Sequence, residues 1–298
     1  MNDQKKAYLQ IHLCVFLWGF TAILGKLITL RELPLVWLRV LITCLSLLFF
    51  PKVIKNLKIL SPKNIFQMGL IGCVVCLHWL CFYGSIKYSN VSVTLSCLST
   101  ASLMTALIEP IFLKKQIKKY QIFLGLMIIP GIYIIFYFTK IYMIGMILGL
   151  LAALLSSIFT TLNKSIVMST KVDSMSITFV ELGSGLLFLT LLIPFYLRIF
   201  PETTLIPSTS DLFYLLILSL VCTVLPYNLS LKSLRHISAF ASTFVVNLEP
   251  VYGIIMAIII FKENKELNSG FYLGSLLIFM AIFLYPILYK RFEKPSMI

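Results

Sequence analysis

The most informative property of this 298-residue chain is how little charge it carries. Only 12% of its residues are charged, whereas an ordinary soluble domain has about 25%. Apolar residues make up 59% of the chain, and its mean hydropathy is +0.98. A single soluble core could not cover this much apolar surface. The composition therefore excludes a soluble enzyme, a nucleic-acid-binding domain and a disordered chain, and it predicts a protein embedded in a lipid bilayer.

Motifs for catalysis and nucleotide binding are also missing. The sequence has no HExxH zinc motif and no GxxxxGK[ST] loop, and its only aspartates (3, 173 and 211) lie outside the apolar stretches or at their ends. All seven cysteines lie inside apolar stretches, which argues against a disulfide framework, and Cys73-x-x-Cys76 lacks the second pair of a metal site. The sequence therefore predicts no catalytic residue, metal or cofactor, and it argues against a membrane-embedded enzyme.

What the sequence does contain is a series of long apolar stretches. A helix that crosses about 30 Å of hydrocarbon needs about 20 apolar residues, and continuous stretches of this length favour helices over β-barrel strands. The chain is thus predicted to be an all-α polytopic membrane protein with ten transmembrane helices. The predicted spans are Tyr8–Leu30, Leu35–Phe50, Asn64–Ile86, Val91–Leu113, Gln121–Phe138, Tyr142–Met168, Ser174–Phe200, Leu212–Leu231, Ser238–Phe261 and Gly270–Tyr289.

The connections between the spans predict the orientation. Of the 25 Lys and Arg residues, 16 lie on the side that holds both termini, six lie on the opposite side, and Lys26, Arg39 and Lys164 lie within spans. Positive charge concentrates on the cytoplasmic side of membrane proteins. We therefore expect both termini in the cytoplasm, in a bacterial inner (plasma) membrane. The large positive charge reports topology and says nothing about the charge of a substrate.

The chain reads as two halves, 1–140 and 141–298. Leu124-Gly125 and Leu273-Gly274 correspond at an offset of 149 residues, and Thr100 then corresponds to Glu249. A competing register that matches Glu109-Pro110 with Glu249-Pro250 would place a span end against a span centre. Because each half has five spans, the second enters the membrane upside down. Inverted repeats of this kind build many secondary transporters.

Three segments resemble one known family. They are Trp18-Gly19 followed by Lys26, the segment SIKYSNVSVTLSCLS at 85–99, and the segment SLKSLRHISAFASTFVVNLEPVYGIIMAIIIFKE at 230–263. Together with the repeated five-span layout, they are similar to the EamA type of the drug/metabolite transporter superfamily. The resemblance implies two inverted five-helix repeats around a central cavity, with the fifth and tenth spans outside. The chain departs from the family where the fourth span ends in Lys114-Lys115 instead of an acidic residue.

Ionisable groups inside hydrocarbon are costly, so each one is a candidate for function. Glu249 lies near the middle of the ninth span between Asn247 and Pro250, and it can bind substrate or carry a proton; the alternative is a role in helix packing alone. His78 lies in the middle of the third span with Trp79 and Tyr83, and a structural histidine is an equal alternative. Proton coupling is assigned to Glu249 or His78.

The other assignments are weaker. Arg39 can bind a carboxylate. Further candidates for the substrate site are Trp18 in the first span, Trp79 and Tyr83 in the third, Ser99 and Thr100 in the fourth, Tyr227 and Asn228 in the eighth, and Asn247 in the ninth. Lys164 and Glu181 are expected to form a structural ion pair, and Glu109 is expected to pair with Lys114. Lys26 is close enough to its span end to reach the interface.

Together these features predict a secondary transporter. We expect alternating access that exports a small metabolite, such as an amino acid or amphipathic compound, driven by a proton gradient or by exchange. A multidrug permease, another solute permease or a channel is the alternative. The expected partners are a small-molecule substrate and the lipid bilayer, with no nucleic acid. The sequence does not distinguish a monomer from a homodimer.

Overall fold

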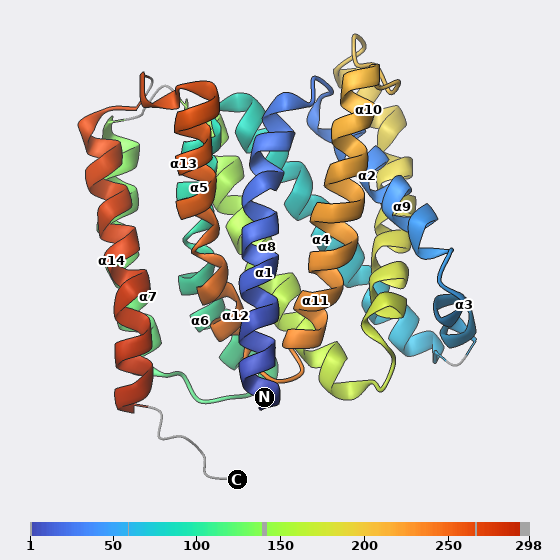
Figure 1. Ribbon diagram of the computed structural model, residues 1–298, viewed down its shortest axis with the longest axis horizontal. Coiled ribbons are helices and arrows are strands. Elements are labelled where there is room, and N and C mark those ends of the chain that lie inside the picture. The colour runs from blue at the N-terminus through green and yellow to red at the C-terminus, as the bar shows by residue number, and fades with distance from the viewer. Residues whose placement is uncertain (1, 59, 139–141, 266, 293–298) are drawn as a thin grey trace.

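The computed structural model describes residues 2–58, 60–138, 142–265 and 267–292, and every regular element in these ranges is a helix. The helices lie side by side in one bundle, and the two ends of the chain lie at the same end of it (Figure 1). In chain order the elements are α1 Asp3–Leu27, α2 Glu32–Leu47, α3 Pro51–Leu57, α4 Pro62–Tyr88, α5 Val91–Leu98, α6 Ala101–Leu113, α7 Lys119–Phe138, α8 Met143–Ser169, α9 Ser174–Ile199, α10 Thr209–Leu216, the π-helix η2 Ile217–Val224, α11 Leu225–Ser233, α12 Ala239–Val246, α13 Glu249–Phe261, the short η3 Glu263–Lys265 and α14 Ser269–Phe292.

Most of these elements are long and apolar enough to cross a membrane. In the part of the chain that the structure describes, seven helical segments meet this condition, and α2 with α3 forms an eighth candidate that bends by 94°. α7 and α14 contain shorter apolar helices. The chain is therefore an integral, multi-pass helical membrane protein. The predicted boundary between the halves at 140/141 lies outside the described residues.

Two of the predicted spans are broken near their middle. α5 and α6 replace the predicted fourth span, with the break at Ser99-Thr100, and α12 and α13 replace the ninth, with the break at Asn247-Leu248. The first helix of each pair has 8 residues and the second has 13. In Figure 1, α5 lies above α6 whereas α13 lies above α12, so the two broken spans run in opposite directions.

The broken spans also correct the expected register. Their helices begin and end 148 residues apart, not 149, so Leu248 and not Glu249 corresponds to Thr100. The ends match in detail. A side chain caps each first helix, as Asn90 Oδ1 accepts from Val93 N and Ser238 Oγ accepts from Ala241 N. A lysine in the left-handed conformation, Lys114 or Lys262, ends each second helix.

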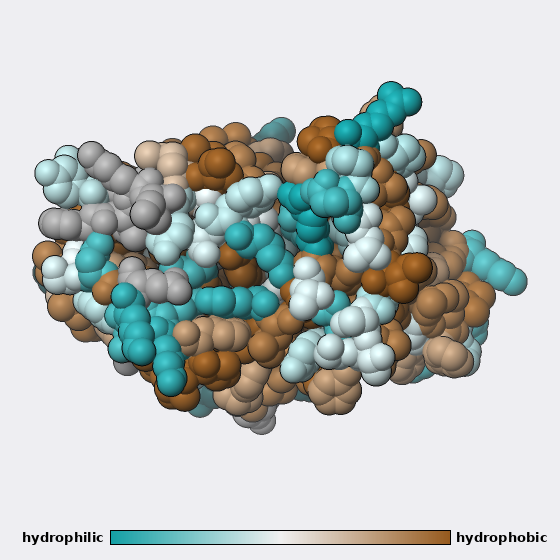
Figure 2. All heavy atoms as spheres, turned by 90° about the horizontal axis from the view of Figure 1, so that it is seen from above, coloured by the Kyte–Doolittle hydropathy of each residue, from teal (hydrophilic) through white to brown (hydrophobic). Residues whose placement is uncertain are grey.

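The surface of the bundle is apolar on its sides and polar at its end. Large apolar side chains such as Phe66, Leu187 and Ile259 are exposed on the outside of the helices, as in a lipid-facing surface. Seen from the end opposite the termini, hydrophilic side chains gather over the middle of the bundle and apolar ones form its rim (Figure 2). The polar centre is where helices of both halves meet.

Three polar contacts join the two halves at the end opposite the termini, and we call them the upper clasp. Lys26 Nζ forms a 2.8 Å ion pair with Glu263. The Thr29 amide and hydroxyl each donate to Asp211 at 2.7 Å. Arg31 forms a 2.9 Å ion pair with Glu202. Lys26, which was expected to reach the interface, pairs there with a glutamate 237 residues further along the chain.

Candidate functional site

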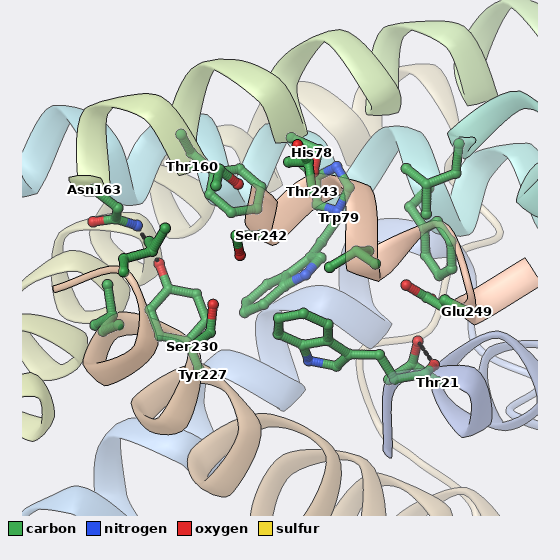
Figure 3. A pocket seen from close by; sticks show the side chains of 18 of the residues that line it. Thr21, His78, Trp79, Thr160, Asn163, Tyr227, Ser230, Ser242, Thr243 and Glu249 are labelled. Carbon is green, nitrogen blue, oxygen red and sulfur yellow. Dashed lines mark hydrogen bonds between the residues drawn. The ribbon is translucent and has the colours of Figure 1, made fainter. Parts of the chain in front are cut away.

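A cavity lies inside the bundle between helices of both halves. Its atom-free space is about 800 Å³, a volume that includes the opening to solvent. Figure 3 shows Tyr227 and Asn163 at one end of it, Glu249 and Thr21 at the other, and Trp79 between them. The lining residues are Trp18, Thr21, Arg39, His78, Trp79, Phe82, Leu98, Ser156, Phe159, Thr160, Asn163, Tyr227, Ser230, Leu231, Leu234, Ser242, Thr243, Val246 and Glu249.

Arg39 of α2 is the cation of this cavity. Its side chain is buried, with 2% of the residue exposed. Nε donates to Thr223 Oγ1 at 2.8 Å and Nη1 donates to Tyr83 OH at 2.7 Å. Its Cζ lies 4.0 Å from the centroid of the Trp79 ring, which is cation–π distance. These neutral contacts hold the guanidinium in place without neutralising it, so it remains available to an anionic group.

Glu249 is the carboxylate of the cavity. It begins α13, directly after the break in the span, and is buried. It interacts electrostatically with Arg39 across the cavity. Among the described residues, however, the ion pairs are Lys26–Glu263, Arg31–Glu202 and Lys115–Glu109. The cavity therefore presents one positive and one negative group that do not form a salt bridge with each other.

His78 has one ring nitrogen fixed by the protein. Its Nδ1 lies 2.8 Å from the carbonyl oxygen of Ala152, and because a carbonyl can only accept, Nδ1 carries the proton. In the neutral ring, Nε2 is then an acceptor. The ring packs against Phe82 and Phe159 at centroid distances of 6.1 Å and 5.3 Å. His78 thus has a structural hydrogen bond and still lines the cavity.

A second polar cluster joins the cavity wall at α8, α9 and α11. Tyr227 OH donates to Glu181 Oε2 at 2.6 Å, and Asn163 Nδ2 donates to Tyr227 OH at 3.5 Å. Tyr227 and Asn163 line the cavity, whereas Glu181 lies behind them. The expected ion pair between Lys164 and Glu181 does not form. Lys164 Nζ donates instead to the carbonyl oxygen of Leu234 at 2.6 Å, because that helix end offers it an unpaired carbonyl.

Six of the eleven predicted substrate-site residues line the cavity, namely Trp18, Arg39, His78, Trp79, Tyr227 and Glu249. Five others are buried outside its lining. Tyr83 lies behind Arg39, and Asn247 Nδ2 donates to Ser102 Oγ at 2.8 Å, which connects the two broken spans. Ser99 and Thr100 donate to backbone carbonyls of α5. Asn228 is buried on α11, and its Oδ1 has no described partner.

The sequence reading missed a polar stripe on α8. Ser156, Thr160 and Asn163 follow each other at intervals of four and three residues, so they share one helix face and line the cavity together. This spacing was readable in the sequence. Ser242 and Thr243 of α12 were also missed, and here no spacing in the short helix distinguishes the cavity face. In the described part of the chain, no three His, Cys, Asp or Glu side chains gather where they could hold a metal ion.

Two carboxylates hold the broken spans together. Glu263, at the end of α13, accepts hydrogen bonds from the first two amides of α5, Val91 N at 3.1 Å and Ser92 N at 3.0 Å. Glu109 of α6 accepts in turn from Ala239 N and Phe240 N at the start of α12. Lys115, not the expected Lys114, pairs with Glu109 at 3.0 Å, and Lys114 ends α6 in the left-handed conformation.

A multi-pass helical bundle with two broken spans and one mixed-charge cavity defines the class of a membrane transporter. The model of the EamA-like transporter family matches the chain twice, over residues 5–137 and 143–286. The chain belongs to the EamA-like transporter family. This confirms the resemblance read from the sequence and supports a transporter, not an enzyme.

Two further comparisons agree with this assignment. The chain is 23% identical over 229 residues to the uncharacterized transporter YxxF of Bacillus subtilis (strain 168), covering 74% of this chain and 70% of that protein. It is also similar in fold to a protein of known crystal structure, with a TM-score of 0.70 and 13% identity over 97% of this chain and 99% of the other. The second likeness concerns the fold alone.

Proposed function

We propose that this protein is a secondary transporter that exports a small amphipathic metabolite, such as an amino acid, by alternating access. One observation carries the proposal: Arg39 and Glu249 are buried in the same cavity, and no described salt bridge neutralises either of them. Buried charges that lack an opposite charge beside them are costly. A substrate that brings complementary groups offsets that cost.

The lining favours a substrate that is partly polar and partly apolar. Arg39 can bind a carboxylate, Glu249 can accept from a donor group, and Trp18, Trp79 and Phe159 offer apolar ring faces. A polyanion such as a nucleotide would need several cations in the cavity. In the described lining, the basic side chains are Arg39 and His78, and a histidine can be neutral. A small molecule with mixed charge and an apolar body fits this set best.

For the architecture, we propose ten transmembrane helices in two inverted five-helix repeats. The support is that two broken spans have matching lengths, lie 148 residues apart and run in opposite directions. The family model also matches each half separately. Two halves of this kind have two packings of similar energy, one open to each side, as alternating access requires.

Transport in this proposal is driven by a proton gradient or by exchange, because the sequence has no nucleotide-binding loop. Glu249 and His78 line the cavity and are the coupling candidates that touch the substrate. The expected location is a bacterial inner membrane with both termini in the cytoplasm. A small-molecule substrate and the lipid bilayer are the partners that the proposal requires.

Counterflow in liposomes tests the proposal. The purified protein is reconstituted, and a panel of amino acids and amphipathic metabolites is tested for exchange of labelled for unlabelled substrate. A carrier gives counterflow, whereas a channel dissipates the gradient without it. Failure of the whole panel, or dissipation alone, would contradict the proposal.

Arg39→Gln then tests the site itself. Hydrogen bonds to charged groups contribute about 1.5–3 kcal/mol, so this variant should raise the half-saturation concentration of a carboxylate substrate by roughly ten- to hundredfold. Arg198→Gln is the matched control, because Arg198 is exposed and does not line the cavity. Equal transport by Arg39→Gln and the control would remove Arg39 from the site.

A further inference from the structure

Glu181 is a carboxyl group whose surroundings are incomplete. The residue is fully buried on α9, with 0% of its surface exposed. Oε2 accepts a 2.6 Å hydrogen bond from Tyr227, but Oε1 has no described partner. The ion pairs of the described residues do not include Glu181, and Lys164, its expected partner, donates to the carbonyl oxygen of Leu234 instead. An ionised carboxylate with one hydrogen bond and no counter-charge is costly to bury.

We infer that Glu181 binds and releases a proton during the transport cycle, as a site separate from the cavity-lining Glu249. The inference rests on the proposed function and names the group that couples it to protons. In the conformation described here, a proton on Oε1 removes the cost of the buried charge. In the other conformation of the cycle, changed contacts around α9 and α11 can release it.

The neighbours of Glu181 suit both protonation states. Asn163 lies next to the Glu181–Tyr227 pair and donates to Tyr227 OH, and an amide group can donate to an ionised carboxylate or accept from a protonated one. Tyr227 OH donates to Oε2 in either state. Asn163 Oδ1 also has no described partner, so the cluster holds an unused acceptor for the added proton. Because Tyr227 and Asn163 line the cavity, they also give the proton a path to Glu181.

Few other titratable groups face this part of α9. From α4, Cys76 lies against Gly185, one turn beyond Glu181, and interacts with Tyr227 of α11. From α2, Cys44 and Arg39 interact with Cys76, while Arg39 itself is directed to the cavity. The lysines of α3, Lys52 and Lys55, are exposed. None of these described neighbours places a charge beside Glu181. A proton on Oε1 would therefore neutralise the buried carboxylate.

Tyr227 links this proton to the substrate. When Glu181 is ionised, the hydrogen bond that Tyr227 OH donates to it becomes stronger. The phenol oxygen of Tyr227 is then a stronger acceptor for a group in the cavity. A substrate ammonium or amine that donates to Tyr227 therefore binds better to the unprotonated carrier. Substrate and proton then weaken each other's binding, which is the relation that favours an exchange of inward protons for exported substrate.

Infrared spectroscopy tests the proton site without any substrate. Difference spectra of the reconstituted protein between alkaline and acidic buffer should contain the C=O stretch of a buried protonated carboxyl, and Glu181→Gln should remove that band. Glu202→Gln is the control, because Glu202 is exposed and lies in the upper clasp. A band that persists in Glu181→Gln and disappears in Glu249→Gln would overturn the inference. Counterflow by the same protein would leave the proposed function intact.

Transport measurements test the link to the substrate. With a transported amine-bearing compound from the panel, one competing proton changes the apparent affinity by up to about tenfold per pH unit. We expect affinity to rise with pH in the unmodified protein and in Glu249→Gln. The apparent affinity should be independent of pH in Glu181→Gln. It should be nearly independent of pH in Tyr227→Phe, which lacks only the hydroxyl that links Glu181 to the cavity. Full pH dependence in Glu181→Gln would overturn the inference.

Discussion

At the scale of single residues, the position of Glu181 depends on a glycine in the neighbouring helix. A Cβ atom on Gly72 of α4 would collide with the backbone carbonyl of Glu181. The absence of a side chain at Gly72 therefore lets α4 and α9 approach closely, as small residues do in membrane bundles. This contact fixes the height of Glu181 relative to the cavity wall.

Gly72→Ala should therefore destabilise the protein. Overpacking of a close contact costs about 1–3 kcal/mol, so the midpoint of thermal unfolding in detergent should fall. Gly183→Ala on α9 is the matched control, since nothing lies within 4 Å of its Cβ position. Alanine is the better helix former, so the control should be as stable as the unmodified protein or more stable. Equal midpoints for the two variants would show that the contact is loose.

The residue scale also shows how far the sequence reading reached. Arg39, Trp79 and Glu249 could be found because a charged or large polar residue within an apolar span needs a reason to be there. The partner of Glu181 could not be found in the same way. Whether Lys164 or Tyr227 faces it depends on the rotation of α8 and α11 about their axes, which is set by packing between helices.

At the scale of elements, the broken spans are held by an exchange of carboxylates. Glu263 follows α13 and caps the start of α5, and Glu109 of α6 caps the start of α12. Unpaired amides and the dipole at a helix start both favour a carboxylate. Each broken span thus supplies the carboxylate that caps the first helix of the other.

Glu263→Gln and Glu109→Gln should both lower stability, the first by more. Glu263 is fully buried, accepts from Val91 N, Ser92 N and Ser92 Oγ, and pairs with Lys26, whereas Glu109 accepts from two amides and pairs with Lys115. Loss of a cap costs about 0.5–2 kcal/mol. Thermal unfolding in detergent measures the effect, with the exposed Glu202→Gln as control. No change in Glu263→Gln would contradict the capping role.

The sequence predicted the apolar spans well and their breaks poorly. α1, α4, α8 and α9 cover the corresponding predicted spans closely, because length and hydropathy follow from the bilayer itself. The breaks after Leu98 and Val246 carry no proline or glycine at the break itself. They are stabilised by distant groups such as Glu263 and Glu109, which local patterns do not reveal.

At the scale of the whole molecule, the cavity and the upper clasp lie at different heights in the bundle. The upper clasp joins the halves at the end opposite the termini. The cavity lining instead includes Ser230, Leu234 and Ser242, near the ends of α11 and α12 on the side of the termini. In the orientation that we propose, with both termini in the cytoplasm, the upper clasp lies on the outer side of the membrane.

Thiol labelling of intact cells tests that orientation. The seven native cysteines are buried or half-buried, so they should give little background. Ile206→Cys, at a position 80% exposed between α9 and α10, should react with a membrane-impermeant maleimide in intact cells. Lys55→Cys, on the exposed face of α3, should react only after permeabilisation. The reverse pattern would place both termini outside the cell.

The π-helix η2 has a consequence for how such a cavity can change. Its turns are wider than those of an α-helix, so each residue rotates the chain by a smaller angle, and within it the Thr223 hydroxyl donates to the carbonyl oxygen of Leu218 at 2.6 Å. An α-helix turns by about 100° per residue. A change of η2 from π-helical to α-helical hydrogen bonding, with the same residues, would therefore rotate α11 about its axis relative to α10 and move Tyr227 away from its place in the wall. A switch between these two hydrogen-bonding patterns inside one span could thus change the face that α11 turns toward the cavity without moving any other helix.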